Sequence, residues 1–367
     1  MIRDYIYGSE LLDNEETANR FTRLEKEELT VRSSPVYYYY QQNKTFTSYN
    51  YVQRGSYDHN NRLELYDNDA IDYRYEVLKE LGHGAFGNVY LCYDHKHGMD
   101  VAVKVIRNER RFHKQAKIEI ELYDLLNTVS PYSDNIIQLH KAFHFRSDLF
   151  MVFQNFGMNL YNYYRKHDIP EDDVKAFGRQ IARGIEHLHN LDIIHMDLKP
   201  ENIMIRDKHL KIIDLGSSMI KEETQVLKKN YVQSRYYRAP EVLFNTGLST
   251  KIDVWSYGCI IYELLTKEPL IPARSTFDLA IYYIHVLGYP PHDMNEIYSN
   301  PDFFTRKSRE LLRFRTKKNK YLYPNDFKWH GIENEEFKKF IKINCLNWDP
   351  KKRSTMSDII NHPYLTS

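Results

Sequence analysis

The stretch that decides the fold is HMDLKPEN, residues 195–202, which follows a segment with helical periodicity at 172–190. Apolar residues recur in that segment at spacings of three and four, as in an amphipathic helix. Asp197 and Asn202 are five residues apart, so one loop can present a carboxylate to an acceptor hydroxyl and an amide oxygen to a metal ion. Lys199 lies between them and adds a cation that can offset developing negative charge. The stretch therefore predicts a loop that carries several catalytic groups.

A further carboxylate follows in IIDLGSS, residues 212–218, after an apolar strand-like segment. An Asp-x-Gly turn is common in proteins, and Asp214 alone would indicate nothing more than a turn. Its position about a dozen residues after Asn202 is less common. Because Mg²⁺ prefers oxygen ligands and often takes only one or two from the protein, we expect Asn202 and Asp214 to be magnesium ligands.

Three glycines stand between two strand-like segments in LGHGAFGNV, residues 81–89. Gly82, Gly84 and Gly87 form the pattern G-x-G-x-x-G, which alone also fits an ordinary hairpin or a dinucleotide-binding turn. A dinucleotide-binding turn opens a helix, whereas the segment that follows here, NVYLCYD, is strand-like. This context favours a loop folded over nucleotide phosphates, where glycine lets the backbone approach closely.

A lysine and a glutamate further along are predicted to form an ion pair. Lys104 ends the strand-like segment VAVK, and on its own it would be taken for an exposed residue. Glu119 lies in a helical segment, on the face that also carries Leu122, Tyr123 and Leu126. A carboxylate on an apolar face needs a partner, and Lys104 is the natural one. Such a pair would hold the lysine on the α- and β-phosphates of a nucleotide.

In this order the groups resemble the motifs of the eukaryotic protein kinase family, and the Ala-Pro-Glu at 239–241 completes the set. The resemblance covers about residues 73–364. It implies an α+β, bilobal protein kinase fold, with a small β-rich N-lobe that has one main helix and a larger, mostly helical C-lobe. We expect a tyrosine-rich N-terminal extension at 1–71 that is partly disordered or docked, an N-lobe at 72–155 and a C-lobe at 156–367.

The resemblance also implies the ligands and the residues that bind them. ATP would be the phosphoryl donor and Mg²⁺ the metal, with Asp197 and Lys199 as catalytic residues. Val89, Ala102 and Met204 would enclose the adenine. Phe153 would be the gatekeeper residue, and residues 154–156 would form the hinge. The implied nucleotide-binding residues are Leu81, Gly82, His83, Gly84, Ala85, Phe86, Gly87, Asn88, Val89, Ala102, Lys104, Glu119, Phe153, Gln154, Asn155, Phe156 and Met204.

Two further positions match the family and two depart from it. Asp253 in DVWSYG resembles the helical anchor of the catalytic loop, and Arg353 in WDPKKRST would pair with Glu241. Met196 stands where the family usually has arginine, and Leu215 stands where it usually has phenylalanine. Neither position carries a phosphate or a metal, so we expect these departures to alter how the enzyme is switched more than its chemistry.

The stretch KNYVQSRYYRAPE, residues 229–241, resembles the activation loop of the DYRK family, the dual-specificity tyrosine-regulated kinases, including its Yak branch. Members of that family phosphorylate the second tyrosine of a Tyr-x-Tyr themselves while they fold. Tyr231 matches that tyrosine, and Lys229 replaces the first. Arg235 and Arg238 are forked donors suited to clamp a phosphate on Tyr231, which is favoured over the alternative that they are solvated loop residues. The resemblance implies a dual-specificity kinase that phosphorylates Ser and Thr in proteins and its own Tyr231.

Composition bears on partners and location. The chain has 367 residues, with 51 Lys+Arg and 50 Asp+Glu, so no overall charge favours nucleic acid or a membrane surface. Three widely spaced cysteines fit neither a disulfide framework nor a zinc site, and they suit a reducing compartment. No signal peptide or membrane-spanning run is recognised. We expect a monomer that acts on protein substrates in the cytoplasm, the nucleus or both.

Other functions remain open from sequence. A pseudokinase scaffold would keep the fold and bind partners without turnover, but the complete set of Lys104, Asp197, Asn202 and Asp214 argues against it. The related homeodomain-interacting kinases carry Ser-Thr-Tyr in the activation loop, and MAP kinases need a threonine two residues before the tyrosine. The Lys-Asn-Tyr at 229–231 matches neither.

Two weaker features concern location and specificity. The basic stretch RFRTKKNK at 313–320 fits a solvated loop better than a nuclear localisation patch. Glu201 and Glu263 are acidic positions expected near the peptide groove, where they would favour arginine upstream of the acceptor. Asn162 stands where the family more often has an acid, which weakens that preference.

Overall fold

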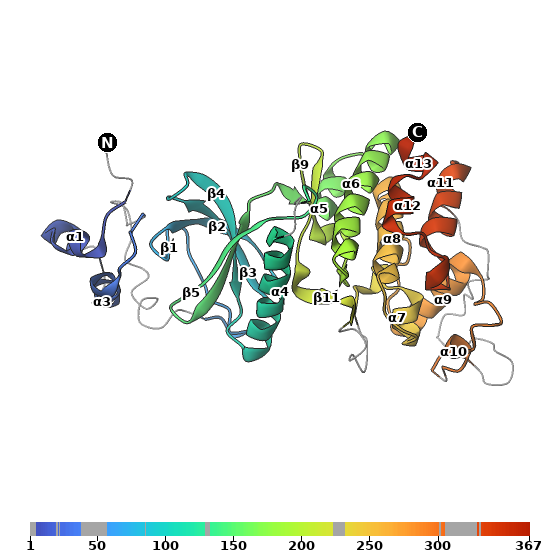
Figure 1. Ribbon diagram of the computed structural model, residues 1–367, viewed down its shortest axis with the longest axis horizontal. Helices are drawn as coiled ribbons and strands as arrows, with labels where there is room; N and C mark the ends of the chain where they lie inside the picture. The colour runs from blue at the N-terminus through green and yellow to red at the C-terminus, as the bar shows by residue number, and fades with distance from the viewer. Residues whose placement is uncertain are drawn as a thin grey trace. The chain divides into compact units, whose positions relative to one another are not determined.

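The protein is represented by a computed structural model that describes residues 5–19, 21, 23–37, 57–84, 86–128, 133–222, 232–300, 302–304, 329 and 332–367. The glycine-loop residue Ala85, the predicted phosphorylation site Tyr231 and the basic stretch 313–320 lie outside these residues. The chain divides into two compact units (Figure 1). Unit 1 comprises Met1–Ser130 and Ile137–Asn155, and unit 2 comprises Pro131–Ile136 and Phe156–Ser367.

Unit 1 is built on a six-stranded antiparallel sheet with the order β1-β2-β3-β4-β6-β5 (Figure 1). Its strands are β1 (Ala70–Ile71), β2 (Tyr75–His83), β3 (Gly87–Asp94), β4 (Met99–Ile106), β5 (Leu139–Phe145) and β6 (Asp148–Gln154). Burial alternates along β3 and β4, because successive side chains of a strand point to opposite faces. The buried core of the sheet includes Val77, Tyr90, Cys92, Val101, Val103, Val105, Phe150 and Val152.

Helix α4 (Arg110–Thr128) packs on this sheet with the apolar stripe that the sequence predicted. The ring of Tyr123 in α4 meets the ring of Phe153 in β6, with 5.3 Å between the centroids. The buried residues of the helix recur at spacings of three and four; they are Phe112, Ala116, Glu119, Leu122, Tyr123 and Leu126. One glutamate therefore enters an otherwise apolar face.

The N-terminal part of unit 1 adds three short helices, α1 (Gly8–Leu12), α2 (Glu15–Ala18) and α3 (Arg23–Val31). Glu28 of α3 accepts two hydrogen bonds from the guanidinium of Arg146, at 2.9 and 3.0 Å, and a third from the hydroxyl of Tyr73. Arg32 binds the carboxylate of Asp72 at 2.8 Å. These charged contacts attach the helices to the turn before β2 and to the turn between β5 and β6.

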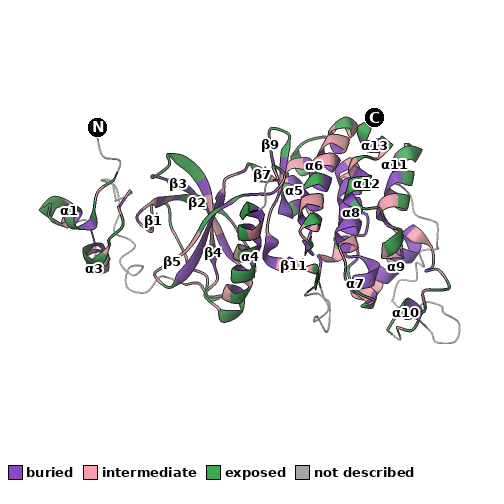
Figure 2. Ribbon diagram, in the orientation of Figure 1, coloured by how far each residue is buried: buried purple, intermediate pink, exposed green. Residues whose placement is uncertain are grey.

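Unit 2 is mainly helical and surrounds one buried helix, α8 (Lys251–Thr266), which is almost wholly purple in Figure 2. Every residue from Ile252 to Leu264 is buried, as expected for a helix in the middle of a domain. The predicted helix at 172–190 is observed as α6 (Glu171–Asn190). The other helices are α5 (Leu160–Lys166), α7 (Pro240–Phe244), α9 (Thr276–Leu287), α10 (Asn295–Tyr298), α11 (Glu335–Lys339), α12 (Met356–Ile360) and α13 (Pro363–Thr366).

Two small sheets complete unit 2, and Asp197, Asn202 and Asp214 lie in the segments that connect their strands. The first has the order β10-β9-β7, and the second pairs β11 with β8. Their strands are β7 (Met158–Asn159), β8 (Ile193–Ile194), β9 (Ile203–Arg206), β10 (His209–Ile212) and β11 (Met219–Ile220). A β-rich unit with one long helix and a larger helical unit confirm the expected α+β, bilobal architecture. In the part of the chain that the structure describes, none of the helices is both long enough and apolar enough to cross a bilayer.

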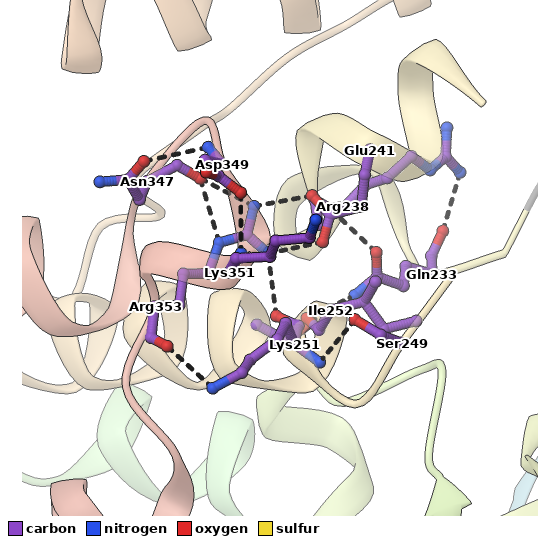
Figure 3. Close-up of polar contacts among 12 residues, drawn as sticks. Gln233, Arg238, Glu241, Ser249, Lys251, Ile252, Asn347, Asp349, Lys351 and Arg353 are labelled. Carbon is purple, nitrogen blue, oxygen red and sulfur yellow. Dashed lines mark hydrogen bonds and ion pairs between the residues drawn. The ribbon is translucent and has the colours of Figure 1, made fainter. Parts of the chain in front are cut away.

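A buried ion pair joins two segments of unit 2 that are 112 residues apart in the sequence, as the resemblance implied (Figure 3). The guanidinium of Arg353 binds both carboxylate oxygens of Glu241, at 2.6 and 2.7 Å. Its remaining donors reach the carbonyl oxygens of Asn347, at 3.0 and 2.8 Å, and of Lys251, at 2.9 Å. All five N–H groups of the arginine are thereby used, which offsets the cost of burying its charge.

Candidate active site

Four of the nucleotide-binding residues expected in unit 1, Val89, Ala102, Lys104 and Phe153, share one face of its sheet. Val89 in β3 lies directly opposite Lys104 in β4, and Ala102 lies opposite Phe153 in β6. Residues paired across antiparallel strands point to the same face. Val89, Ala102 and Lys104 are only partly buried, whereas Val103 between the last two is buried on the other face. This face therefore carries these four of the side chains that the resemblance assigned to the nucleotide.

The predicted ion pair between Lys104 and Glu119 is present. The Lys104 ammonium donates to both carboxylate oxygens of Glu119, at 3.0 and 2.9 Å. The Glu119 side chain is 3% exposed and that of Lys104 is 13% exposed, so each charge depends on the other for compensation. The ring of Phe86 lies 5.7 Å from the ammonium. The cation is thus held at a defined place on the sheet.

The glycine loop turns tightly and leaves space at two of its glycines. The amide of Gly84 donates to the carbonyl oxygen of Gly87 at 2.9 Å. A Cβ atom at Gly87, where φ is 154°, would lie 1.8 Å from the carbonyl oxygen of Val105, so only glycine fits there. A Cβ atom at Gly82 or Gly84 would meet nothing within 4 Å among the described residues. Because packing does not require these two glycines, the open backbone fits the approach of phosphate groups.

The other expected nucleotide-binding residues of unit 1 differ in exposure. Leu81 and His83 are exposed at the end of β2, while Gln154 and Asn155 are partly buried. Asn88 is buried, and its amide donates to the hydroxyl of Tyr90 at 3.1 Å and to a backbone carbonyl. Asn88 therefore supports the loop from within the unit.

Two expected nucleotide-binding residues belong to unit 2. Met204 lies in β9 and is partly buried between the buried residues Ile203 and Ile205. Phe156 is buried, and its ring centroid lies 5.1 Å from the guanidinium of Arg206 and 5.4 Å from the ammonium of Lys211. The two cations hold this ring in place.

The expected catalytic carboxylate, Asp197, is enclosed by a lysine and a serine. The ammonium of Lys199 lies 2.6 Å from Oδ2 of Asp197. Ser234 donates to Oδ1 through its hydroxyl, at 2.7 Å, and through its backbone amide, at 3.0 Å. Lys199 also donates to the Ser234 hydroxyl at 3.3 Å. The three polar groups form one hydrogen-bonded cluster that fixes both carboxylate oxygens.

Ser234 is the member of this cluster that the sequence analysis missed. It lies 37 residues from Asp197, in the stretch that contains Tyr231, Arg235 and Arg238. The available signal was a small hydroxyl residue in an otherwise basic and aromatic segment. Sequence spacing gives no reason to bring that hydroxyl to the expected catalytic carboxylate, because the contact joins residues that are far apart in the chain.

A buried carboxylate from α8 supports the backbone of the catalytic loop. Asp253 accepts from the amide of His195 at 2.9 Å and from the amide of Met196 at 3.1 Å. It also lies 3.0 Å from Nε2 of His189. The anchor role implied for Asp253 is thus observed. Met196 has φ of 64°, an unfavourable region for its residue type, and the two bonds to Asp253 stabilise this conformation.

The predicted metal ligands are brought together by backbone bonds. The amide of Ile213 donates to the carbonyl oxygen of Asn202 at 3.0 Å, which places Asp214 beside the catalytic loop. The carbonyl oxygen of Ile213 lies 3.0 Å from Nε2 of His195. Asn202 donates through Nδ2 to the carbonyl oxygen of Asp197 at 2.9 Å, so Oδ1 is the side-chain oxygen that can serve a metal. Leu215, the second departure from the family, is fully buried next to Asp214.

This arrangement fits Mg²⁺ better than a metal that needs a complete protein cage. Among the residues that the structure describes, no three His, Cys, Asp or Glu side chains are grouped to hold a metal ion. Asn202 and Asp214 would supply one amide and one carboxylate oxygen. Mg²⁺ commonly takes one or two protein ligands and completes its shell with phosphate and water oxygens.

The two arginines of the predicted phosphate clamp, Arg235 and Arg238, lie shortly after residue 232, where the described chain resumes. Arg238 is buried and donates to the carbonyl oxygens of Val232, at 3.0 Å, and Gln233, at 2.8 Å. Arg235 is partly buried and donates to the carbonyl oxygen of Arg274 at 3.0 Å. The structure therefore gives Arg238 a role in shaping the backbone, beside the phosphate-binding role expected from sequence.

A groove of about 480 Å³ adjoins the catalytic cluster, with Lys199, Ser234, Glu201 and Glu268 in its lining. Glu263 also lines it but is buried, and its two oxygens accept from the hydroxyls of Tyr164, at 2.6 Å, and Tyr237, at 2.7 Å. Burial raises the pKa of Glu263. The sequence predicted Glu263 near a peptide groove; Glu263 lines the groove described here, but two tyrosines already use its oxygens, whereas Glu201 is exposed.

Comparison with known proteins agrees with this geometry. The family described as "Protein kinase domain" matches residues 75–365. "Dual specificity tyrosine-phosphorylation-regulated kinase 3" of Homo sapiens is 36% identical over 326 residues, which cover 81% of this chain and 55% of the relative. "Dual specificity tyrosine-phosphorylation-regulated kinase mbk-2" of Caenorhabditis elegans is 35% identical over 342 residues, covering 86% of this chain and 41% of the relative.

"Probable serine/threonine-protein kinase dyrk2" of Dictyostelium discoideum is 35% identical over 314 residues, covering 82% of this chain and 34% of the relative. The chain thus spans between a third and just over half of the length of the curated relatives it matches. It belongs to the protein kinase family, in the group of dual specificity tyrosine-phosphorylation-regulated kinases that the activation segment predicted.

Proposed function

We propose that the chain is an active protein kinase that transfers the γ-phosphoryl group of ATP to Ser or Thr in protein substrates. The observation that carries this proposal is the cluster of Asp197, Lys199 and Ser234, with Asn202 bonded to the same loop. A scaffold without turnover would have no need to fix both oxygens of a partly buried carboxylate beside a lysine. The complete cluster therefore favours catalysis over the pseudokinase alternative.

Each group of the cluster has a role in the transfer. Asp197 orients the acceptor hydroxyl and takes up its proton, and Lys199 offsets negative charge on the phosphoryl group. Lys104, held by Glu119, positions the phosphates, and Gly82 and Gly84 allow the loop backbone to approach them. Mg²⁺ bound with ATP would supply neutralisation of the phosphate charge, with Asn202 and Asp214 as its protein ligands.

We further propose dual specificity through modification of the chain's own Tyr231. Phosphotyrosine carries nearly two negative charges and three acceptor oxygens. Arg235 and Arg238 follow it within seven residues and are suited to bidentate binding. Arg238 already holds the backbone at 232 and 233, so a phosphate bound by it would be coupled directly to the conformation of the segment that carries Ser234.

The groove beside the catalytic cluster is proposed to receive the peptide around the acceptor. Glu201 is exposed there and favours a basic residue in the substrate, while Asn162 adds no charge. We propose a monomer acting on proteins in the cytoplasm, the nucleus or both. The three cysteines, Cys92, Cys259 and Cys345, are buried free thiols, which suits a reducing compartment. The division into an extension at 1–71 and lobes at 72–155 and 156–367 stays part of this proposal.

The experiment that tests the proposal is transfer of labelled γ-phosphate to an array of Ser-, Thr- and Tyr-containing peptides by the purified chain. We expect Mg²⁺-dependent labelling of Ser and Thr peptides, with Tyr labelling confined to the chain itself. Nucleotide binding without peptide labelling would favour the scaffold.

A further inference from the structure

A short segment before the sheet, Tyr57–Leu65, forms a compact hairpin in unit 1. Tyr57 and Leu63 pair as an antiparallel bridge. The carboxylate of Asp58 accepts from the amides of Asn60, at 2.8 Å, and Arg62, at 2.9 Å, which closes the turn. Asn61, at the end of the turn, has φ of 57°, a conformation that asparagine tolerates better than most residues. The hairpin is therefore an ordered element held by its own hydrogen bonds.

The hairpin is fastened to the sheet at its two ends. The carbonyl oxygen of Leu63 accepts from Asn88 at 3.4 Å and from the hydroxyl of Tyr90 at 3.3 Å, and the Leu63 side chain belongs to the sheet core. The hydroxyl of Tyr57 donates to Asp148 at 2.7 Å. Burial, together with that bond, raises the pKa of Tyr57 to about 12, so its hydroxyl keeps the proton that it donates.

A third attachment joins the tip of the hairpin to the segment that leads into α4. The amide of Asn108 donates to the carbonyl oxygen of Asn61 at 3.1 Å, and the Asn108 side chain donates to the Tyr57 hydroxyl at 3.2 Å. The hairpin backbone thus spans from β3 to the start of the helix that carries Glu119. Its position relative to the sheet is fixed independently of any single side chain.

Arg62 extends from this fixed hairpin to the glycine loop. Its Nη2 donates to the carbonyl oxygen of Gly84 at 2.9 Å. Its Nε is buried and has no hydrogen-bond partner among the described residues. This part of the Arg62 side chain is therefore packed against the protein and does not extend into solvent. Gly84 is exposed, and no neighbouring atom lies where its Cβ would be. The Arg62 guanidinium thus fixes the carbonyl group of Gly84, a residue that is not held by side-chain packing.

We propose that Arg62 is a positioning residue for nucleotide binding, which holds the glycine loop in the conformation that receives the phosphates. Glycine loses more conformational entropy on ordering than any other residue. A loop already held by Arg62 has less entropy to lose when the nucleotide binds, and so binds it more tightly. This inference rests on the proposed kinase function, because it assigns the loop to ATP.

Arg62→Ala tests the inference through its separate effects on KM and kcat. We expect KM for ATP to rise about three- to tenfold, the size of one lost hydrogen bond, while kcat at saturating ATP stays within about twofold of wild type. Arg62→Lys, which keeps the charge and one donor, should recover part of the loss. Arg23→Ala removes an exposed arginine of the same unit that pairs with the exposed Glu27, and should change neither parameter.

Hydrogen–deuterium exchange without nucleotide supplies a readout that does not depend on activity. In Arg62→Ala, faster exchange is expected in peptides covering residues 82–88 and unchanged exchange in β4 and α4. An unchanged KM for ATP, or unchanged exchange in the loop, would overturn the role of Arg62. A general loss of thermal stability with faster exchange throughout unit 1 would also overturn it, because Arg62 would then be a structural residue. A wild-type chain that binds ATP without transferring phosphate would contradict the proposed function. The role of Arg62 would then be decided by two measurements on Arg62→Ala, namely the exchange rate of the loop and the affinity for the nucleotide.

Discussion

Ser234 offers the clearest test of how the catalytic carboxylate is held. Its hydroxyl donates to Oδ1 of Asp197 at 2.7 Å, and its amide donates to the same oxygen at 3.0 Å. Ser234→Ala removes the first bond and keeps the second. A hydrogen bond to a charged group contributes about 1.5–3 kcal/mol, and the lower end applies because the Asp197 side chain is 19% exposed and water can replace part of the bond. We therefore expect kcat/KM to fall about tenfold.

The assay is steady-state transfer to a Ser peptide with both substrates varied, together with the affinity for Mg·ATP. The loss should appear in kcat/KM for the peptide, while the ATP dissociation constant stays close to wild type, because no nucleotide-binding residue is changed. Ser234→Thr keeps the hydroxyl and should retain most activity. Ser357→Ala, on the exposed side of α12, is a matched control. A kcat/KM for Ser234→Ala within twofold of wild type would refute the argument that this hydroxyl fixes Asp197.

The remaining predictions of this group concern unit 2. Arg353→Ala leaves Glu241 buried without its partner, which costs about 3–5 kcal/mol. The melting temperature should fall by about 6–20 °C, and a fall under about 3 °C by scanning fluorimetry would contradict the buried pair. Wild-type protein made in bacteria should carry phosphate on Tyr231 by mass spectrometry, and Tyr231→Phe should lose part of its peptide activity. Adding Arg235→Ala to Tyr231→Phe should reduce peptide activity little further, since both changes remove the same clamp. Fully additive losses of activity would contradict the clamp.

The parts of the fold that sequence predicted depend on local periodicity. The stripe of α4 placed Glu119 among apolar residues, and the need for a partner then selected Lys104. The structure has both the stripe and the pair. The long amphipathic pattern likewise placed α6 within one residue of its observed start. These features could be predicted because the spacing within one element determines which side chains share a face.

The features that sequence did not predict depend on contacts between distant segments. Glu263 was expected to offer its charge to a peptide, but two tyrosines from other elements occupy its oxygens. Ser234 bonds to Asp197, a residue 37 positions away in the sequence. Glu28 attaches the N-terminal helices through Arg146, a residue more than a hundred positions away. No local pattern contains this information.

The high tyrosine content has a partial explanation in the same kind of contact. Tyrosine hydroxyls donate to partly or fully buried carboxylates at several places in the described part of the chain. These pairs are Tyr57 with Asp148, Tyr73 with Glu28, Tyr164 and Tyr237 with Glu263, and Tyr364 with Glu171. A neutral donor satisfies a carboxylate without burying a second charge. Composition alone could not reveal this use.

The central claim is that Asp197 orients and deprotonates the acceptor, and Asp197→Asn tests it most directly. Asparagine keeps the size of the side chain but loses the charge that accepts a proton. The measurement is single-turnover transfer to a Ser peptide, with Mg·ATP affinity and melting temperature determined on the same sample. We predict a fall in transfer rate of at least about a hundredfold, with nucleotide affinity and stability close to wild type. Transfer at the wild-type rate would contradict the claim, and the catalytic base would have to be sought elsewhere.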